Sequence, residues 1–143
     1  MKRTLMKILL VSIIFLATFS VRAQTVSLAQ SVARGKTIYE GQCMSCHMAE
    51  GEGLESVYPS LTKSDNLKDK NRLAKIVLKG QRGTIKVKGV DYSGEMIGFA
   101  MNDQEVADVL NFIRNSWGNK NAEIRPGEIQ PALKMETKGY QPY

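Results

Sequence analysis

The chain has 143 residues, with 20 lysine and arginine residues against 14 aspartate and glutamate residues. Four of the basic residues and none of the acidic ones lie in residues 1–23, so residues 24–143 hold 16 basic against 14 acidic residues, a net charge of +2. A nucleic-acid-binding protein needs a concentrated basic surface, and this near-balance excludes that partner. The length suits one small domain.

Residues 1–23 have the pattern of a secretory signal peptide. Lys2, Arg3 and Lys7 precede an apolar run from Ile8 to Phe19, and Val21-Arg22-Ala23 provides a small-residue cleavage site. The apolar run is short for a membrane span, which needs about 20 residues. We therefore expect cleavage after Ala23 and a soluble periplasmic protein without a membrane span. An uncleaved signal, which would anchor the protein to the membrane, is the alternative.

A helix is expected from Ser27 to about Gly41. Ser27 suits the N-cap, and Leu28, Val32 and Tyr39 supply apolar positions. Gly35 lies inside this helix, where glycine costs up to ~1 kcal/mol relative to alanine. We expect either that another element approaches the backbone closely there or that this is an ordinary helix glycine.

The sequence Cys43-Met44-Ser45-Cys46-His47 contains both cysteines and the only histidine of the chain. This C-x-x-C-H pattern is typical of a covalent attachment site for c-type haem. The thiols of Cys43 and Cys46 would bond to the vinyl groups as thioethers, and His47 would be the proximal ligand of the iron. The pattern therefore predicts one covalently bound haem c.

Four other interpretations of this motif are weaker. A structural zinc site needs four ligands, and the chain has only three Cys and His residues. A thioredoxin-like pair normally accompanies a β-α-β unit, and none is predicted nearby. A disulfide across two residues would close a very short loop. A catalytic Cys–His pair usually comes from distant positions in the sequence.

After His47 we expect loops, because Glu50-Gly51-Glu52-Gly53 is unsuited to a regular element. A carbonyl near Pro59 could accept a hydrogen bond from the second ring nitrogen of His47, which would orient the ring. The alternative is that Pro59 is simply a loop proline.

The second half of the chain predicts two more helices with a hairpin or loop between them. The first of these helices runs from Asn71 to Lys79, with Lys75 among its outward residues and Gly80 at its end. Alternation from Thr84 to Lys88 then predicts one small hairpin or an extended loop. A final helix begins at Asn102 or Asp103 and ends near Trp117-Gly118. Its buried stripe consists of Val106, Val109, Leu110, Phe112 and Ile113. Residues 119–143 contain prolines and glycines and predict an extended or partly disordered arm.

From about Val32 to Gly118 the sequence resembles the class I, monohaem cytochromes c. Gly35, Tyr39 and Cys43 match the first helix of that family, and Val109 and Phe112 match its last helix. The resemblance implies an all-α cytochrome c fold of about three to five helices around the haem, with a domain over residues 24–118. It also implies that Gly35 lies where these two helices cross. The carbonyl of Pro59 would hold His47.

The same resemblance assigns the second iron ligand. Met96-Ile97-Gly98-Phe99 is similar to the family's M-P-x-F segment, with Ile97 in place of the usual proline. Met96 is thus the expected distal ligand, and Met101, beside the last helix, is the alternative. The sequence from Phe112 to Asn119 further resembles cytochrome c subunits of periplasmic dehydrogenases and nitrite reductases.

These features predict an electron-transfer protein rather than an enzyme, with unidentified redox proteins as partners. Lys79, Arg82, Lys86 and Lys88 could form a basic docking face or simply a solvated surface. Three alternatives stay open at this point. The protein could be a haem subunit docked to a larger periplasmic oxidoreductase, a haem sensor or peroxidase with an open sixth site, or a haem-free dithiol oxidoreductase.

Overall fold

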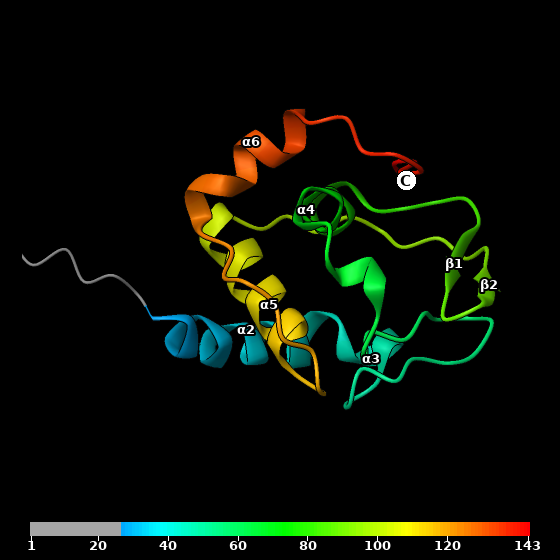
Figure 1. The fold of residues 1–143 in the computed structure, drawn as a ribbon, viewed down its shortest axis with the longest axis horizontal. Helices are drawn as coiled ribbons and strands as arrows, with labels where there is room; N and C mark the ends of the chain where they lie inside the picture. The colour runs from blue at the N-terminus through cyan, green and yellow to red at the C-terminus, as the bar shows by residue number, and fades with distance from the viewer. Residues whose placement is uncertain (1–26) are drawn as a thin grey trace, which may run out of the picture.

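A computed structural model describes residues 27–143, so the predicted signal peptide lies outside the described residues. Within this range the elements are α2 (Leu28–Gln42), α3 (Met44–His47), the 3₁₀-helix η1 (Asp65–Leu67), α4 (Lys70–Lys79), β1 (Ile85–Val87), β2 (Val90–Tyr92), α5 (Asp103–Asn115), the 3₁₀-helix η2 (Pro126–Glu128) and α6 (Ile129–Lys134). Helices dominate, and one small hairpin stands at the edge (Figure 1). The predicted all-α class is confirmed. None of the helices in residues 27–143 has the length and apolar character that a membrane crossing requires.

Side-chain caps begin the three main helices, at the predicted positions Ser27 and Asn102 and at Asp69, which was not predicted. Ser27 accepts from the backbone of Gln30, whose side chain accepts in return from the backbone of Ser27. Asn102 and Glu105 form the same reciprocal pair before α5. The carboxylate of Asp69 accepts from the first turn of α4. Each cap satisfies backbone donors that have no partner inside the helix.

The crossing of α2 and α5 depends on the missing side chain of Gly35. A Cβ atom at this position would lie 1.9 Å from the carbonyl oxygen of Asp108 and 2.9 Å from Cβ of Phe112. The carboxylate of Asp108 is buried here and accepts hydrogen bonds from Ser31 and Arg34. The predicted close approach at Gly35 is therefore confirmed, with the backbone of α5 as the approaching element.

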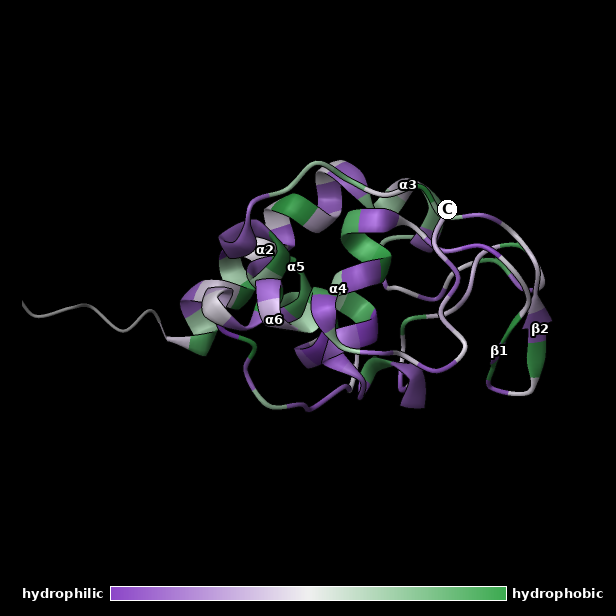
Figure 2. Cartoon of the chain, turned by 90° about the horizontal axis from the view of Figure 1, so that it is seen from above, coloured by the Kyte–Doolittle hydropathy of each residue, from purple (hydrophilic) through white to green (hydrophobic). Residues whose placement is uncertain are grey.

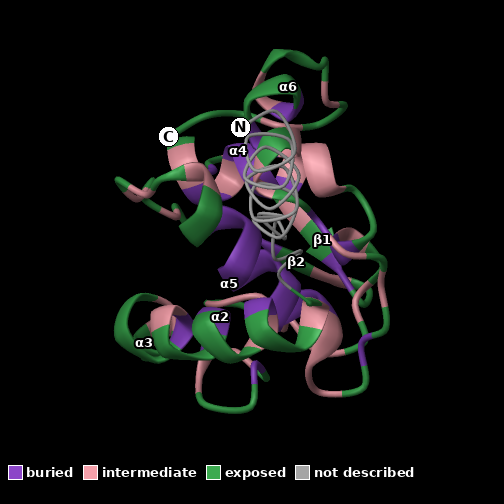
Figure 3. Ribbon diagram, turned by 90° about the vertical axis from the view of Figure 1, so that its left-hand side faces the viewer, coloured by how far each residue is buried: buried purple, intermediate pink, exposed green. Residues whose placement is uncertain are grey.

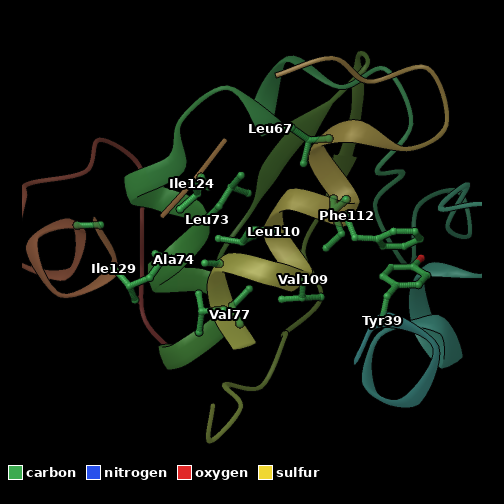
Figure 4. Close-up of a cluster of buried hydrophobic side chains, with 14 residues drawn as sticks. Tyr39, Leu67, Leu73, Ala74, Val77, Val109, Leu110, Phe112, Ile124 and Ile129 are labelled. Atoms are coloured by element: carbon green, nitrogen blue, oxygen red, sulfur yellow. The ribbon is translucent and has the colours of Figure 1, made fainter. Parts of the chain in front are cut away.

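Helix α5 runs through the middle of the core. Figure 3 shows that buried residues concentrate along α5, which contacts α2, α4 and α6. The apolar side chains of the cluster appear in Figure 4. On the α2 side, Tyr39 packs against Phe112 and Trp117, with ring centroids 5.3 and 5.0 Å away. The predicted inward stripe of α5 is entirely buried.

The predicted hairpin is also present. Val87 pairs with Val90, and the two connecting residues, Lys88 and Gly89, have φ values of 51° and 86°. Two consecutive left-handed residues form the tight turn whose twist matches that of paired strands.

The predicted extended arm is wrong for residues 126–134, which form η2 and α6. Ile124, Ile129 and Ala132 from this region are buried in the core. The side chain of Asn111 on α5 donates to the carbonyl of Ile124 and accepts from its amide, at 2.8 Å each. The proline and glycine content of the segment does not predict this structure, because polar side chains of helix α5 hold the segment in place.

The expectation that Lys75 faces outward is also wrong. Only 8% of it is exposed. Its ammonium group donates to the carbonyl of Met135 and lies 5.7 Å from the ring centroid of Tyr140. The last residues of the chain cross α4 and cover this side of it. Figure 2 shows that α4 carries hydrophilic as well as hydrophobic residues, so its pattern alone does not reveal the cover.

A pair of glycine substitutions in α2 tests the crossing. Gly35→Ala should lower the free energy of unfolding by about 1–3 kcal/mol, because the added carbon forces α2 away from α5. Gly41→Ala is the matched control, since a Cβ atom there meets nothing within 4 Å. It should leave stability unchanged or raise it by about 0.5–1 kcal/mol. Denaturant unfolding measures both, and equal effects would contradict the close contact.

Candidate haem site

Cys43, Cys46 and His47 lie together on one helical turn. α2 ends at Cys43, whose amide donates to the carbonyl of Tyr39 at 2.9 Å, and α3 begins there. The amide of His47 donates to the carbonyl of Cys43 at 2.9 Å. Both cysteines are free thiols and are partly exposed. The end of α2 therefore sets the position of all three side chains.

His47 is a buried neutral imidazole with one nitrogen already engaged. Its Nδ1 atom lies 3.0 Å from the carbonyl oxygen of Pro59. A carbonyl only accepts, so Nδ1 must carry the proton and donate. Burial lowers the pKa of His47, although the bond to Pro59 opposes this shift. The lone pair is consequently on Nε2, for which residues 27–143 supply no hydrogen-bond partner. A histidine held in this way is prepared to ligate a metal.

Gly53 allows the loop after α3 to bring Pro59 to His47. Its amide donates to the carbonyl of His47 at 3.0 Å, and its φ of 68° suits glycine. A Cβ atom here would lie 2.3 Å from the carbonyl oxygen of Tyr58 and 2.9 Å from that of Pro59. The loop then closes where the amide of Leu54 donates to the carbonyl of Tyr58 at 2.9 Å.

The same loop also packs on the aromatic cluster. The Tyr39 hydroxyl donates to the carbonyl of Met48 at 2.7 Å. Gly51 has a φ of 67°, and a Cβ atom there would lie 2.6 Å from the Trp117 ring. The roles of Gly51, Gly53 and Trp117 are not predicted from the sequence. The two glycines, separated by one residue in a segment without a regular element, were the available signal for backbone turns.

Met96 lies on a different segment, between β2 and α5. Its amide donates to the carbonyl of Gln81, and the amide of Gln81 donates back to its carbonyl, both at 2.8 Å. Phe99 adds a bond from its amide to the carbonyl of Val77 on α4 at 2.8 Å. Met96 and Met101 are both half-buried, and Met101 packs against the hydrophobic core cluster. Among the described residues, no hydrogen bond joins Met96 to the Cys43–His47 turn.

Two of the rival interpretations of the motif find no support. No group of three or more His, Cys, Asp and Glu residues in positions 27–143 is placed to hold a metal ion, as a zinc site would need. Burial raises the pKa of the Cys43 thiol to about 11. A reactive dithiol needs a lowered thiol pKa. Two thiols on one turn beside a neutral imidazole with a free Nε2 are, in contrast, the donor set that haem c requires.

Comparison with known proteins identifies the family. The sequence profile of the family described as "Cytochrome c" matches residues 32–117. Cytochrome c-552 of Thermus thermophilus is 34% identical over 150 residues, covering 99% of this chain and 91% of that protein. The gluconate 2-dehydrogenase cytochrome c subunit of Pantoea cypripedii is 36% identical over 110 residues, which is 72% of this chain but only 24% of that subunit. The chain belongs to the cytochrome c family.

A third relative is also a cytochrome c subunit of a dehydrogenase. The cytochrome c subunit of the quinone alcohol dehydrogenase of Gluconobacter oxydans is 34% identical over 112 residues, or 22% of its own length. The resemblance seen in the sequence, to class I cytochromes c and to cytochrome subunits of dehydrogenases, is thus confirmed. The protein carries haem c bound covalently and functions in electron transfer; it is not an enzyme.

Substitution of two glycines separates the Pro59 contact from backbone strain. Gly53→Ala should push the Pro59 carbonyl away from His47, which lowers the basicity of the imidazole and raises the reduction potential of the haem-loaded protein. Gly89→Ala is the control, because its φ of 86° is also positive but a Cβ atom there meets nothing within 4 Å. We expect Gly53→Ala to destabilise by about 1–3 kcal/mol more than Gly89→Ala. A redox titration and denaturant unfolding check the two effects, and a potential equally changed by both would contradict the role of Pro59.

Proposed function

We propose that the thiols of Cys43 and Cys46 form the two thioether links to one haem c and that Nε2 of His47 ligates its iron. The hydrogen bond between His47 and Pro59 carries this proposal, because it fixes the tautomer that leaves Nε2 free. Met96 is the proposed ligand on the opposite side. Its backbone amide and carbonyl both bond to Gln81, while Met101 packs against the hydrophobic core cluster.

The bound haem would supply a one-electron iron couple. The protein's own residues determine how that couple behaves. The Pro59 carbonyl orients His47 and increases its basicity. A thioether at Met96 favours the ferrous state relative to a second nitrogen ligand. His47 and Met96 would together hold the iron, which would leave no position for a substrate and would suit the passage of single electrons.

The protein's location and its division into parts remain proposals. We infer export to the periplasm with cleavage after Ala23, supported by the basic, apolar and small-residue order of residues 1–23. Retention of the signal would anchor the chain to the membrane. The C-x-x-C-H domain would span residues 24–118. Residues 119–143 form its C-terminal arm, much of which packs back onto α4 and α5.

A separate electron carrier is the role we favour. The cytochrome c-552 relative matches along nearly its whole length, whereas the dehydrogenase cytochrome subunits match over about a quarter of theirs. A subunit of a larger oxidoreductase is the second candidate, favoured by 36% identity to the gluconate 2-dehydrogenase subunit. Copurification with a catalytic protein at fixed stoichiometry would support the second candidate over the first.

The proposed basic docking face is smaller than the sequence implies. Lys86 is paired with Asp91 at 2.8 Å, and the ammonium of Lys88 donates to the Thr62 hydroxyl at 2.9 Å. Lys79 and Arg82 are exposed, and no ion pair of the described residues involves them. Lys88 is exposed as well and bonds only to neutral hydroxyls, so these three cations are the part of the face available to an acidic partner.

Replacement of each candidate methionine tests the distal ligand. Met96→Ala should lower the reduction potential, abolish the far-red charge-transfer band of the ferric protein and open the reduced iron to carbon monoxide, because a thioether ligand is lost. Met101→Ala should do none of these and should instead cost about 1–2 kcal/mol of stability, because its side chain is partly buried against the core. Absorption spectra and a redox titration measure the difference. A reversal of the two results would assign the iron to Met101.

Loss of the proximal ligand should prevent assembly. His47→Ala, expressed in a host able to attach haem c, should yield no covalent haem, since the ligand that holds the iron under the thiols is missing. Met44→Ala, between the same two cysteines, should still mature. Haem staining on a denaturing gel and the mass of the protein report attachment. Colourless wild-type protein with two titratable thiols would refute the proposed function.

A further inference from the structure

The last residues of the chain return to the molecule instead of leaving it. The hydroxyl of Tyr140 donates to the carbonyl of Lys75 at 3.3 Å. The carbonyl of Gln141 accepts from the amide of Arg82 at 3.0 Å, and the amide of Tyr143 donates to the carbonyl of Lys79 at 3.2 Å. In Figure 1 the C-terminus accordingly lies beside α4. The end of the chain is therefore attached to the end of α4 and to the residues that follow it.

The contacts of Gln141 and Tyr143 fall on the short segment that also bonds to Met96. We call residues 79–82 the bridging segment. Lys79 and Arg82 bond to the C-terminal residues, and Gln81 between them exchanges two backbone bonds of 2.8 Å with Met96. Different backbone groups of the bridging segment therefore bond to the C-terminal residues and to Met96.

Gly80 shows how closely the three segments meet. A Cβ atom at Gly80 would lie 2.4 Å from the carbonyl oxygen of Met96, 2.5 Å from Cβ of Tyr143 and 2.9 Å from the amide nitrogen of Gly98. Its φ of 70° also suits glycine. The C-terminal residue and the Met96 segment therefore pack against the same backbone atom, and a displacement of one changes the space available to the other.

The Met96 segment does little to fix its own conformation. Residues 93–101 contain two glycines and no proline, and Ile97 is 55% exposed. Such a backbone has many accessible conformations. Its position must come from contacts with neighbours, of which the pair of bonds to Gln81 is the nearest to the thioether.

We propose that Gln141 and Tyr143 are positioning residues for Met96, acting through the bridging segment. They hold Arg82 and Lys79 by backbone hydrogen bonds, and Gln81 in turn holds the backbone of Met96. The sulfur of Met96 is thereby kept at a constant place relative to the rest of the site. This inference rests on the proposed role of Met96 as the distal iron ligand.

The decisive variant removes one backbone donor. Its control loses the same side chain, so the two variants differ in the hydrogen bond. Tyr143→Pro eliminates the amide that bonds to Lys79, because proline has no N–H. Tyr143→Ala is the matched control, since it loses the ring but keeps the amide. A chain ending at Gly139 removes both tail bonds to the bridging segment and the Tyr140 contact. All three variants are tested as haem-loaded proteins.

We expect the amides of Gln81 and Met96 to exchange with deuterium about tenfold faster in Tyr143→Pro, as for the loss of one hydrogen bond. The shortened chain should show a larger increase. The far-red band of the ferric protein should weaken, the potential should shift down and carbon monoxide should bind the reduced protein faster. Tyr143→Ala should stay within about twofold of the wild type, since its hydrogen bonds are intact.

The measurements separate this inference from the function on which it rests. If Met96→Ala leaves the far-red band intact, the proposed ligand is wrong and the positioning role is overturned with it. If Met96→Ala abolishes the band but the shortened chain exchanges, absorbs and titrates as the wild type, only the positioning role is overturned. Faster exchange with an unchanged band and potential, or equal acceleration of the amides of α5, would indicate a purely structural tail and would also overturn it.

Discussion

The contact between Gly35 on α2 and the backbone of Asp108 on α5 is the constraint on which the rest of the structure depends. No side chain separates the two helices at this point, and the buried carboxylate of Asp108 is held by Ser31 and Arg34 from α2. Since α2 ends at Cys43, this crossing also determines where the Cys43–His47 turn lies relative to the core. A packing contact near the middle of α2 thereby places the turn proposed to bind the haem.

Both segments of the proposed iron site are held mainly by backbone hydrogen bonds. Pro59 reaches His47 because Gly53 lets the loop turn back, and Met96 is kept in place by reciprocal bonds with Gln81. Backbone contacts of this kind change little when a side chain rearranges. They suit a protein whose ligands must stay in place during electron transfer, because movement of the ligands would slow it.

The C-terminal region extends the same organisation. Polar side chains of α5 hold residues 119–125: Arg114 donates to the carbonyl of Ala122 at 2.7 Å, and Asn111 pairs with the backbone of Ile124. α6 then packs on α4, and the last residues reach the bridging segment. Residues beyond the family match thus contribute to the same core and lie next to the segment that carries Met96.

The sequence by itself determined the three main helices, the hairpin and the motif, because these depend on neighbours in the chain. Caps at Ser27 and Asn102, the alternation from Thr84 to Lys88 and the spacing of Cys43, Cys46 and His47 are all local patterns. The resemblance to a known family added the expected places of Gly35, Pro59 and Met96. Only the tertiary structure decided the burial of Lys75 and the helical tail, since these depend on contacts between residues some 60 positions apart. Proline and glycine content describes the chain's own preferences, and it does not report hydrogen bonds that a distant helix provides.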